Sequence, residues 1–290
     1  MAEATRVKGE WKRLTVQAAA FLLQNPKLHN FFLGTIDTGK TKAVCVPGLN
    51  CYSCPAAIGA CPVGSLQNAL SAKKPSFPFY VLGFLLLFGL LCGRWICSHI
   101  CPFGLVQDLI YRIPFPKKVR TFKGDRVLRL AKYAVLAVLV IALPLFDTLK
   151  PYYCKYLCPS GTLFGAIPLT LTNPMLRGQI GFLFWWKVGV LVTLLLLSLL
   201  IARPFCRYLC PLGAIYGLFN RVALTHLAYR PDACVQCGRC ETVCPMGIDP
   251  KTQFDSAECI RCGRCQKVCP TGSLAVRFGL RTDAHKKSAI

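Results

Sequence analysis

The sequence lacks the short motifs that mark the common nucleotide, haem and metallohydrolase sites. No G-x-G-x-x-G, Walker loop, C-x-x-C-H or H-E-x-x-H occurs in its 290 residues, so no flavin, nucleotide or c-type haem site can be read from it. Acidic side chains are scarce, 12 against 35 lysines and arginines, and the formal net charge is +23. Histidine is also scarce: only His99 lies inside a motif, while His29, His226 and His285 show no partner spacing.

Cysteine, by contrast, is plentiful and regularly spaced. Six of the 19 cysteines are followed by proline, one free residue and glycine. The last two of these close two copies of C-x2-C-x2-C-x3-C-P, the spacing of bacterial ferredoxins with two [4Fe–4S] clusters, in which each run gives its fourth thiolate to the other cluster. A zinc site or disulfides are the alternatives. The first cluster is expected on Cys234, Cys237, Cys240 and Cys269, and the second on Cys259, Cys262, Cys265 and Cys244.

The chain is too apolar for an ordinary soluble protein of its size. Hydrophobic residues make up 54% of it, and the mean hydropathy is +0.45. Residues 77–96, 128–146 and 182–201 are each close to the ~20 apolar residues that cross a ~30 Å hydrocarbon core. A fourth segment, 14–33, is interrupted by polar residues and either spans or lies in the interface. No small-residue cleavage site follows it, so we count it as the first of four spans.

The distribution of positive charge predicts the topology. The connection between the second and third spans is rich in lysine and arginine, and the next connection is not. By the positive-inside rule the former is cytoplasmic, which places both termini in the cytoplasm and the protein in a prokaryotic inner membrane. A cysteine-rich loop over 35–76 then falls outside. Nucleic-acid binding is the other interpretation of so much positive charge. The apolar spans argue against it, and no nucleic-acid partner is expected.

The 11 cysteines outside the ferredoxin runs follow the spans. C-x3-C-P-x-G recurs after the second, third and fourth spans, and C-x2-C-x6-C-P-x-G follows the first. The membrane half is therefore expected to be duplicated about a pseudo-two-fold axis. A C-x3-C pair lies on one face of a helix, so each motif is expected to be half of a cluster site. Proline and glycine should then break the helix and turn backbone amides toward the sulfurs.

Topology sorts these cysteines into two layers, and each can supply the four thiolates of a cluster. The inner layer holds Cys97, Cys101, Cys206 and Cys210. The outer cluster is expected on Cys54, Cys61, Cys154 and Cys158, with Cys51 as the alternate ligand. Packing as small hydrophobes is the alternative for these pairs and the expectation for Cys92. On an oxidising outer face, a disulfide between Cys45 and Cys51 is a further alternative.

Three polar residues near the motifs have open roles. His99 lies between Cys97 and Cys101, where it either tunes or ligates a cluster or serves as a polar interfacial residue. Arg94 and Arg203 precede their motifs at similar distances. Each either neutralises the negative charge of a thiolate-ligated cluster or snorkels at a helix end.

These residues together resemble the NapH/NosR/CcoG-like polyferredoxin family. The segment Phe-Cys206-Arg-Tyr-Leu-Cys210-Pro-Leu-Gly, followed by the two ferredoxin runs, carries the resemblance, which extends from about the second span to Thr271. It implies an integral membrane iron–sulfur protein with four spans and cytoplasmic ends, which passes electrons from quinol toward a periplasmic acceptor. It also matches Cys97, Cys101, Cys206 and Cys210 to the two C-x3-C-P motifs of the family. The third such motif and the loop around residues 51–54 depart from this pattern and indicate a distinct branch.

The sequence thus predicts an all-α membrane bundle of about four helices over 1–222, a small α+β ferredoxin domain with two [4Fe–4S] clusters over 223–278, and a basic tail over 279–290. The predicted function is electron transfer across the membrane through up to four [4Fe–4S] clusters. A basic cytoplasmic face would steer an acidic ferredoxin, flavodoxin or dehydrogenase partner, and membrane lipid and an outer-face redox acceptor complete the expected partners. The alternatives are a NapH-like quinol dehydrogenase subunit, with quinone as a further cofactor, and a redox assembly or regulatory factor.

Overall fold

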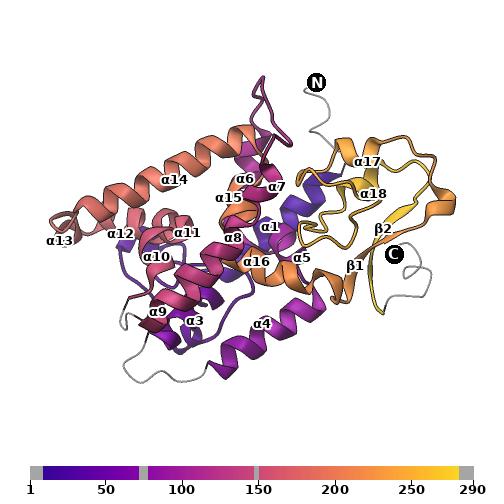
Figure 1. The fold of residues 1–290 in the computed structure, drawn as a ribbon. Helices are drawn as coiled ribbons and strands as arrows, with labels where there is room; N and C mark the ends of the chain where they lie inside the picture. Colours follow the sequence, from indigo (N-terminus) through magenta and orange to yellow (C-terminus); the bar gives the residue numbers. More distant parts are fainter. Residues whose placement is uncertain (1–8, 72–77, 147–149, 281–290) are drawn as a thin grey trace.

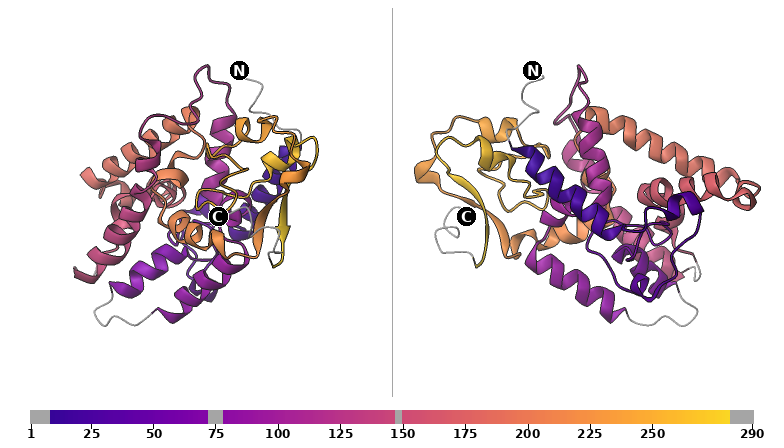
Figure 2. Two further views of the ribbon diagram at one scale, coloured as in Figure 1. Left: turned by 45° about the vertical axis from the view of Figure 1, so that its right-hand side comes forward. Right: turned by 180° about the vertical axis from the view of Figure 1, so that it is seen from behind.

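The computed structural model describes residues 9–71, 78–146 and 150–280. It has a helical part, which contains most of the chain, and a small domain with two strands at one end of the molecule (Figures 1 and 2). Only residues 279 and 280 of the predicted basic tail fall within the described part.

The helices of eight or more residues are α1 (Glu10–Gln24), α3 (Pro62–Leu70), α4 (Phe79–Leu91), α6 (Pro102–Arg112), η3 (Val135–Ala142), α14 (Phe182–Leu200) and α16 (Pro211–Leu218). Shorter helical segments in the first half of the chain are α2 (Asn30–Leu33), η2 (Lys40–Ala43), α5 (Trp95–His99), α7 (Asp125–Leu128), α8 (Ala131–Ala134) and α9 (Leu143–Phe146). Those in the second half are α10 (Tyr152–Tyr156), α11 (Pro159–Gly161), η4 (Thr162–Ala166), α12 (Ile167–Thr172), α13 (Pro174–Arg177), α15 (Pro204–Tyr208), η5 (Phe219–Arg221), η6 (Pro231–Ala233), α17 (Arg239–Thr242) and α18 (Arg264–Val268).

Two helices in the described residues are long and apolar enough to cross a membrane. They are α14 and the continuous helix Asp125–Phe146, which combines α7, α8, η3 and α9, and they coincide with the predicted spans 182–201 and 128–146. α4 is equally apolar but has only 13 residues, and Phe77, the predicted start of that span, lies outside the described residues. A bundle of four membrane helices is therefore not confirmed.

The first predicted span is interrupted in the structure. α1 ends at Gln24, Asn25 and Pro26 follow, and α2 covers only four residues. The buried face of α1 is polar: Arg13, Gln17 and Gln24 donate hydrogen bonds to backbone carbonyls of residues 98, 101 and 100. α1 thus satisfies the carbonyls of a cysteine-bearing turn, which an apolar helix could not do.

The C-terminal domain forms around one antiparallel strand pair. β1 (Thr225–Tyr229) pairs with β2 (Leu274–Phe278), with Thr225 opposite Phe278. The pairing brings the two ends of the domain together and encloses a small core that includes Leu227, Phe254 and Leu274. The predicted α+β ferredoxin domain is thereby confirmed in its secondary structure.

Candidate iron–sulfur sites

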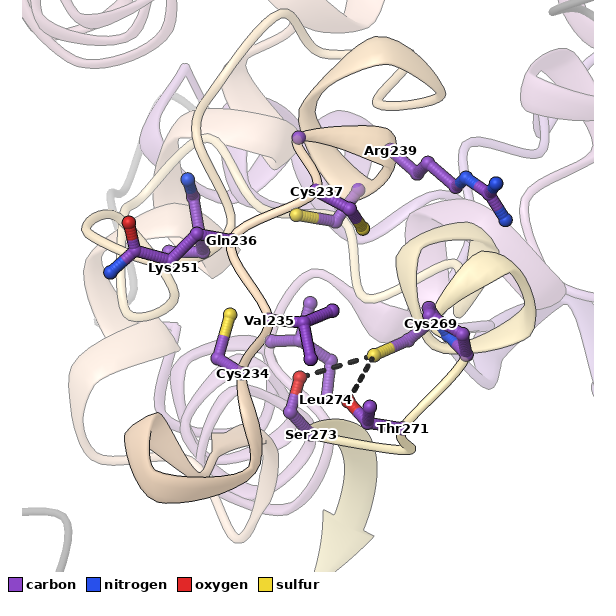
Figure 3. Close-up of a pocket in the computed structure, with 13 residues that line it drawn as sticks. Cys234, Val235, Gln236, Cys237, Arg239, Lys251, Cys269, Thr271, Ser273 and Leu274 are labelled. Atoms are coloured by element: carbon purple, nitrogen blue, oxygen red, sulfur yellow. Dashed lines mark hydrogen bonds between the residues drawn. The ribbon is translucent and has the colours of Figure 1, made fainter.

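The small domain contains two cavities, and each is lined by one of the two predicted sets of four cysteines. Each has a volume of about 20 Å³. In the first, the sulfurs of Cys234, Cys237 and Cys269 surround the space between α17 and the start of β2 (Figure 3). The second cavity is lined by Cys244, Cys259, Cys262 and Cys265. These donor sets fit a cubane, which four thiolates hold.

The two ferredoxin runs wrap their cavities with the same backbone conformation. Gln236 and Gly238 in the first run have φ values of 50° and 71°, and Arg261 and Gly263 in the second have 52° and 72°. Left-handed residues of this kind turn successive N–H groups toward one side of the chain and form an anion-binding concavity. The loops therefore suit the negative charge of a thiolate-ligated cluster.

Cysteines of the two cavities differ in exposure and in pKa. Cys237 at the first cavity is exposed, and Cys269 lies 3.1 Å from the hydroxyl of Ser273 (Figure 3). Burial opposes ionisation of Cys269, but hydrogen bonds from Ser273 and Thr271 outweigh it and lower its pKa to about 6. Burial instead raises the pKa of Cys259 in the second cavity to about 12. The Cys269 thiol at the first cavity therefore ionises more readily than the Cys259 thiol at the second.

The three C-x3-C-P motifs share one backbone geometry. In each, the first cysteine lies in a short helix, α5, α10 or α15, and the second precedes the next helix, α6, α11 or α16. The N–H of the second cysteine bonds to the carbonyl oxygen five residues earlier, at 3.1 Å for Cys101, 3.0 Å for Cys158 and 2.9 Å for Cys210. The expectation that each pair lies on one face of a continuous helix is therefore wrong, because the chain turns between the two cysteines.

Proline and glycine in these motifs begin the next helix instead of breaking the preceding one. The second cysteine is the N-cap residue, and proline is the first residue of the new helix. The glycine N–H then donates to the cysteine sulfur, at 3.4 Å in Gly161–Cys158 and 3.3 Å in Gly213–Cys210. Cys61 precedes α3 in the same way. Backbone amides do face the sulfurs, and the motif places each thiolate at a helix N-terminus.

The inner group, Cys97, Cys101, Cys206 and Cys210, lies together in the main hydrophobic core. Each of the four is at most 5% exposed. Gln107 donates a hydrogen bond of 3.3 Å to the sulfur of Cys206. Burial and the charges of Cys206 and Cys97 raise the pKa of Cys101 to about 12, although the N–H groups of Leu49 and Gly104 favour its thiolate. A group of thiolates that repel one another in a buried site is stable when shared metal compensates the charge.

Arg94 and Arg203 are buried beside the inner group, with exposed fractions of 0% and 1%, so neither snorkels. Arg94 donates to the carbonyl of Cys206 at 2.9 Å, and on its other side contacts the Glu258 carboxylate at 3.1 Å. Arg203 contacts Asp108 at 2.6 Å and the Cys97 carbonyl. Both guanidinium groups thus place positive charge next to the cysteine group.

Arg94 and Asn220 also join the inner group to the second ferredoxin run. Arg94 donates to the carbonyl of Ala257 at 2.7 Å, and the backbone N–H of Arg94 donates to the Asn220 side chain at 3.0 Å. Asn220 in turn donates to the carbonyl of Cys259 at 2.8 Å. The second cavity and the inner group are therefore held in a fixed relation by buried hydrogen bonds.

Four of the outer cysteines lie near two glycines, and Cys54 does not. Cys51 and Cys158 both approach Gly161, where a Cβ atom would lie 3.4 Å and 3.8 Å from their sulfurs. At Gly64, which follows Cys61 by three residues, a Cβ atom would lie 3.8 Å from the sulfur of Cys154. Cys54 instead belongs to a separate small apolar cluster with two alanines, and its sulfur lies 3.6 Å from the Asn25 side chain.

Part of the predicted outer loop lies inside the core, between the two cysteine groups. Leu49 and Asn50 are 2% and 1% exposed. The Leu49 N–H donates to the Cys101 thiolate, and its carbonyl accepts a 3.1 Å hydrogen bond from Ser160, two residues after Cys158. The loop therefore packs against residues of both cysteine groups, and its position outside the membrane stays a prediction.

Several residues at these sites were not identified from the sequence. Gln67, Gln107 and Tyr216 each follow the cysteine of a C-P-x-G motif by six residues, a spacing that could have revealed them. Tyr216 is fully buried and donates to the carbonyl of Pro47 at 3.1 Å. Tyr153 is also fully buried, and its hydroxyl has no hydrogen-bond partner among the described residues. Glu258 shows no such signal, because its partner Arg94 is distant in the sequence.

The remaining candidates have local contacts. The His99 ring stacks on Trp95 at 4.2 Å, and its Nδ1 lies 2.6 Å from the Ser98 hydroxyl, so it is held by its own helix. The Cys92 carbonyl accepts a hydrogen bond from Arg261. All 19 cysteines are described and are free thiols, including Cys45. Among the described residues, no three His, Cys, Asp or Glu side chains converge on a single metal ion, whereas in a cubane each thiolate binds a different iron.

Comparison with known proteins gives family models described as 4Fe–4S binding domains. One matches residues 74–122, 133–167 and 182–228, and two others match 226–248 and 252–274. These matches confirm the prediction that the protein binds iron–sulfur clusters. No solved structure matches the chain.

Curated relatives match along the same region. The methylamine utilization ferredoxin-type protein MauN of Paracoccus denitrificans is 33% identical over 62% of this chain and 59% of its own. The uncharacterized protein MJ0750 of Methanocaldococcus jannaschii is 32% identical over 58% of this chain and 66% of its own. The regulatory protein NosR of Stutzerimonas stutzeri is 30% identical over 53% of this chain and 20% of its own. The chain thus covers less than two thirds of each of these relatives. It belongs to the NosR/NapH-like family of ferredoxin-type 4Fe–4S proteins.

Proposed function

We propose that this protein is a membrane-embedded electron carrier that relays electrons between a cytoplasmic partner and the opposite face of the membrane. The observation that carries the proposal is the order of its cysteine groups. Figure 1 shows the small domain at one end, α5, α15 and α16 in the middle, and α3, α10 and α11 toward the other end. When bound, [4Fe–4S] clusters accept and donate single electrons, and a series of them divides a distance too long for one tunnelling step.

Exposure of the apolar helices supports a membrane location. Two helices, Asp125–Phe146 and α14, are each long and apolar enough to cross a membrane. In each of them, only 17% of the most apolar stretch is buried inside the protein. A helix in the core of a soluble protein would be mostly buried, whereas lipid covers an apolar surface of this extent. The excess of lysine and arginine between residues 112 and 129 favours a cytoplasmic position for that connection and for the ferredoxin domain.

The charged residues of the chain hold the cysteine groups in place. Glu258 bridges Arg94 and Lys132, and all three side chains lie at the junction of the ferredoxin domain with the helices. Arg264, in the second ferredoxin run, pairs with Glu10 of α1. Removing one member of a buried ion pair costs about 3–5 kcal/mol, so these pairs favour one fixed docking of the domain.

The exposed rim of the first cavity suits an acidic partner. Cys237 and Arg239 are exposed there, Lys251 lies at the edge, and Val235 is 62% exposed (Figure 3). A partly apolar patch with positive charge beside a cluster site attracts the acidic surface of a soluble ferredoxin or flavodoxin. We therefore place the cytoplasmic contact at this rim, and the outer redox acceptor at the opposite end of the molecule.

Metal analysis and vesicle assays test the proposal. The full chain, purified without oxygen, is expected to contain about sixteen irons and as many acid-labile sulfides, four for each of four cubanes. In sealed liposomes, reductant supplied to the ferredoxin side should reduce an acceptor trapped on the other side. About eight irons, or no transfer across sealed vesicles by fully loaded protein, would contradict the proposal.

A quinol dehydrogenase subunit is the second candidate. An open apolar groove between Phe122 and Ala134 lies where a candidate span begins. Reduction of the clusters by a short-chain quinol, blocked by Val127→Trp in the groove, would favour this function. The third alternative, an assembly or regulatory role, predicts that deletion of the protein removes a cofactor from a partner enzyme and leaves electron flux unchanged.

A further inference from the structure

We propose that Cys51, Cys61, Cys154 and Cys158 form one [4Fe–4S] site and that Cys54 is not a ligand. This inference rests on the proposed function, which it deepens by assigning the thiolates of the outer site. These four cysteines are named here the outer group. Cys51 lies in the loop before α3, Cys61 at the start of α3, Cys154 in α10 and Cys158 at the start of α11.

The inner group supplies a template for this site. Gln107 follows Cys101 by six residues, and its Oε1 accepts a 3.2 Å hydrogen bond from the N–H of Phe205, next to Cys206. Gln67 follows Cys61 by six residues, and its Oε1 accepts a 3.3 Å hydrogen bond from the N–H of Cys154. The same unit therefore occurs twice. In each copy, a helix that begins with C-P-x-G carries a glutamine whose side chain accepts a hydrogen bond from the backbone of a C-x3-C-P motif or of the residue before it.

This duplication assigns three of the four outer thiolates. Cys61 corresponds to Cys101, and the pair Cys154 and Cys158 corresponds to the pair at 206 and 210. The fourth inner thiolate, Cys97, precedes Cys101 by four residues, but the matching position before Cys61 is Ala57, which offers no ligand. The outer group must therefore take its fourth thiolate from another part of the chain.

Cys51 occupies the missing position. Its sulfur and that of Cys158 lie against the same glycine, Gly161, whose N–H donates to Cys158. At Gly64, a Cβ atom would lie 3.8 Å from the sulfur of Cys154 and 3.9 Å from the Cβ of Cys61. Because Cys154 and Cys158 belong to one motif, these two glycine contacts bring all four cysteines together.

Lys187 supplies a counter-charge to the same group. It is the one charged residue in α14, and its neighbour Trp186 donates a 3.2 Å hydrogen bond to the carbonyl of Tyr156 in α10, so this part of α14 lies beside the outer group. Arg94 and Arg203 have the same role beside the inner group. A positive charge within an apolar helix is costly unless it faces a negative partner, and a thiolate-ligated cluster provides one.

Cys54 does not lie against Gly161. It is 1% exposed, and its sulfur lies at the Asn25 side chain within a small apolar cluster that also contains Ala56 and Ala57. Cys51 packs against that cluster and also approaches Gly161. Cys54 therefore packs beside the site without contributing a ligand.

The test compares Cys51→Ala with Cys54→Ala in the full chain, purified without oxygen. Cys51→Ala is expected to lose about four irons and four sulfides per chain, one cubane, and Cys54→Ala is expected to keep the parent content. Cys51→Ser should retain a cluster with one oxygen ligand, which changes its EPR and Mössbauer spectra. The signals of the ferredoxin clusters, unchanged in every variant, show that each chain is folded.

The outcomes separate this inference from the proposed function. If the parent and Cys51→Ala both contain about sixteen irons while Cys61→Ala loses four, the ligand assignment is wrong and the proposed function stands. A loss in Cys54→Ala but not in Cys51→Ala also overturns the assignment. If the parent contains only about eight irons, the outer site does not exist and both proposals fail.

Discussion

Replacing Arg94 with glutamine is expected to lower the reduction potential of the inner cluster. The Arg94 side chain is fully buried, and its guanidinium contacts the Cys206 carbonyl, the Ala257 carbonyl and the Glu258 carboxylate. A buried positive charge stabilises the reduced cluster, which carries one more negative charge than the oxidised one. Glutamine keeps part of the hydrogen bonding but removes the charge.

The expected shift follows from Coulomb's law. A charge that contacts the carbonyl of a ligating cysteine lies ~8 Å from the cluster centre, where two unit charges interact by about 2 kcal/mol at an effective dielectric constant of ~20. For a one-electron couple, 59 mV corresponds to a factor of ten, or about 1.4 kcal/mol, so the potential should fall by about 90 mV. Glu258 keeps its contact with Lys132, which limits the loss of stability to the unpaired carbonyls, at about 1–3 kcal/mol each.

EPR-monitored redox titration of the purified full chain measures this shift. Arg94→Lys is the matched control, because it keeps the charge and loses the planar, multidentate geometry. We expect the lysine variant to titrate close to the parent and the glutamine variant clearly below it. If the glutamine variant contains its full iron and every cluster titrates at the parent potential, the electrostatic argument is refuted.

Three further predictions concern docking, packing and backbone contacts. Arg239→Glu at the exposed rim of the first cavity should slow reduction by an acidic ferredoxin several-fold at low salt, and the difference should shrink as salt is added; an equal rate in stopped-flow measurements would place docking elsewhere. Phe103→Ala removes a ring that is 0% exposed and should cost about 3–5 kcal/mol in unfolding free energy, whereas Phe32→Ala, 87% exposed, should stay within ~0.5 kcal/mol; similar losses would show that burial does not set the cost. Gly104→Ala would place a methyl group 2.9 Å from a backbone oxygen of the inner group and should lower both the melting temperature and the iron content, while Gly83→Ala, with nothing within 4 Å, should be neutral or stabilising; a fully loaded, stable Gly104→Ala protein would contradict this.

The ferredoxin sets were predictable because their geometry is local. Three cysteines within seven residues can approach one cavity only by wrapping around it, and the left-handed residues at 236, 238, 261 and 263 carry out that turn. The exchange of the fourth thiolate between runs also follows from the known spacing. The structure lines one cavity with each predicted set.

Long-range contacts limited the remaining predictions. The segment 14–33 is apolar enough to suggest a span, but Arg13, Gln17 and Gln24 of α1 find backbone carbonyls of a turn more than 75 residues away. The loop around Leu49 follows the first helix, and its burial depends on contacts with residues 101 and 160. Neither partner can be read from local hydrophobicity.

The sequence by itself determined the chemistry of this protein: the number of cysteines, their grouping into repeated motifs, and the two apolar helices that match the predicted spans. Each of these depends on residues close together in the chain, where spacing dictates geometry. Only the tertiary structure decided which distant cysteines meet, as Cys51 rather than Cys54 lies beside Gly161. It also decided that Arg94 faces inward, because the energy of a buried charge depends on partners that the fold brings to it.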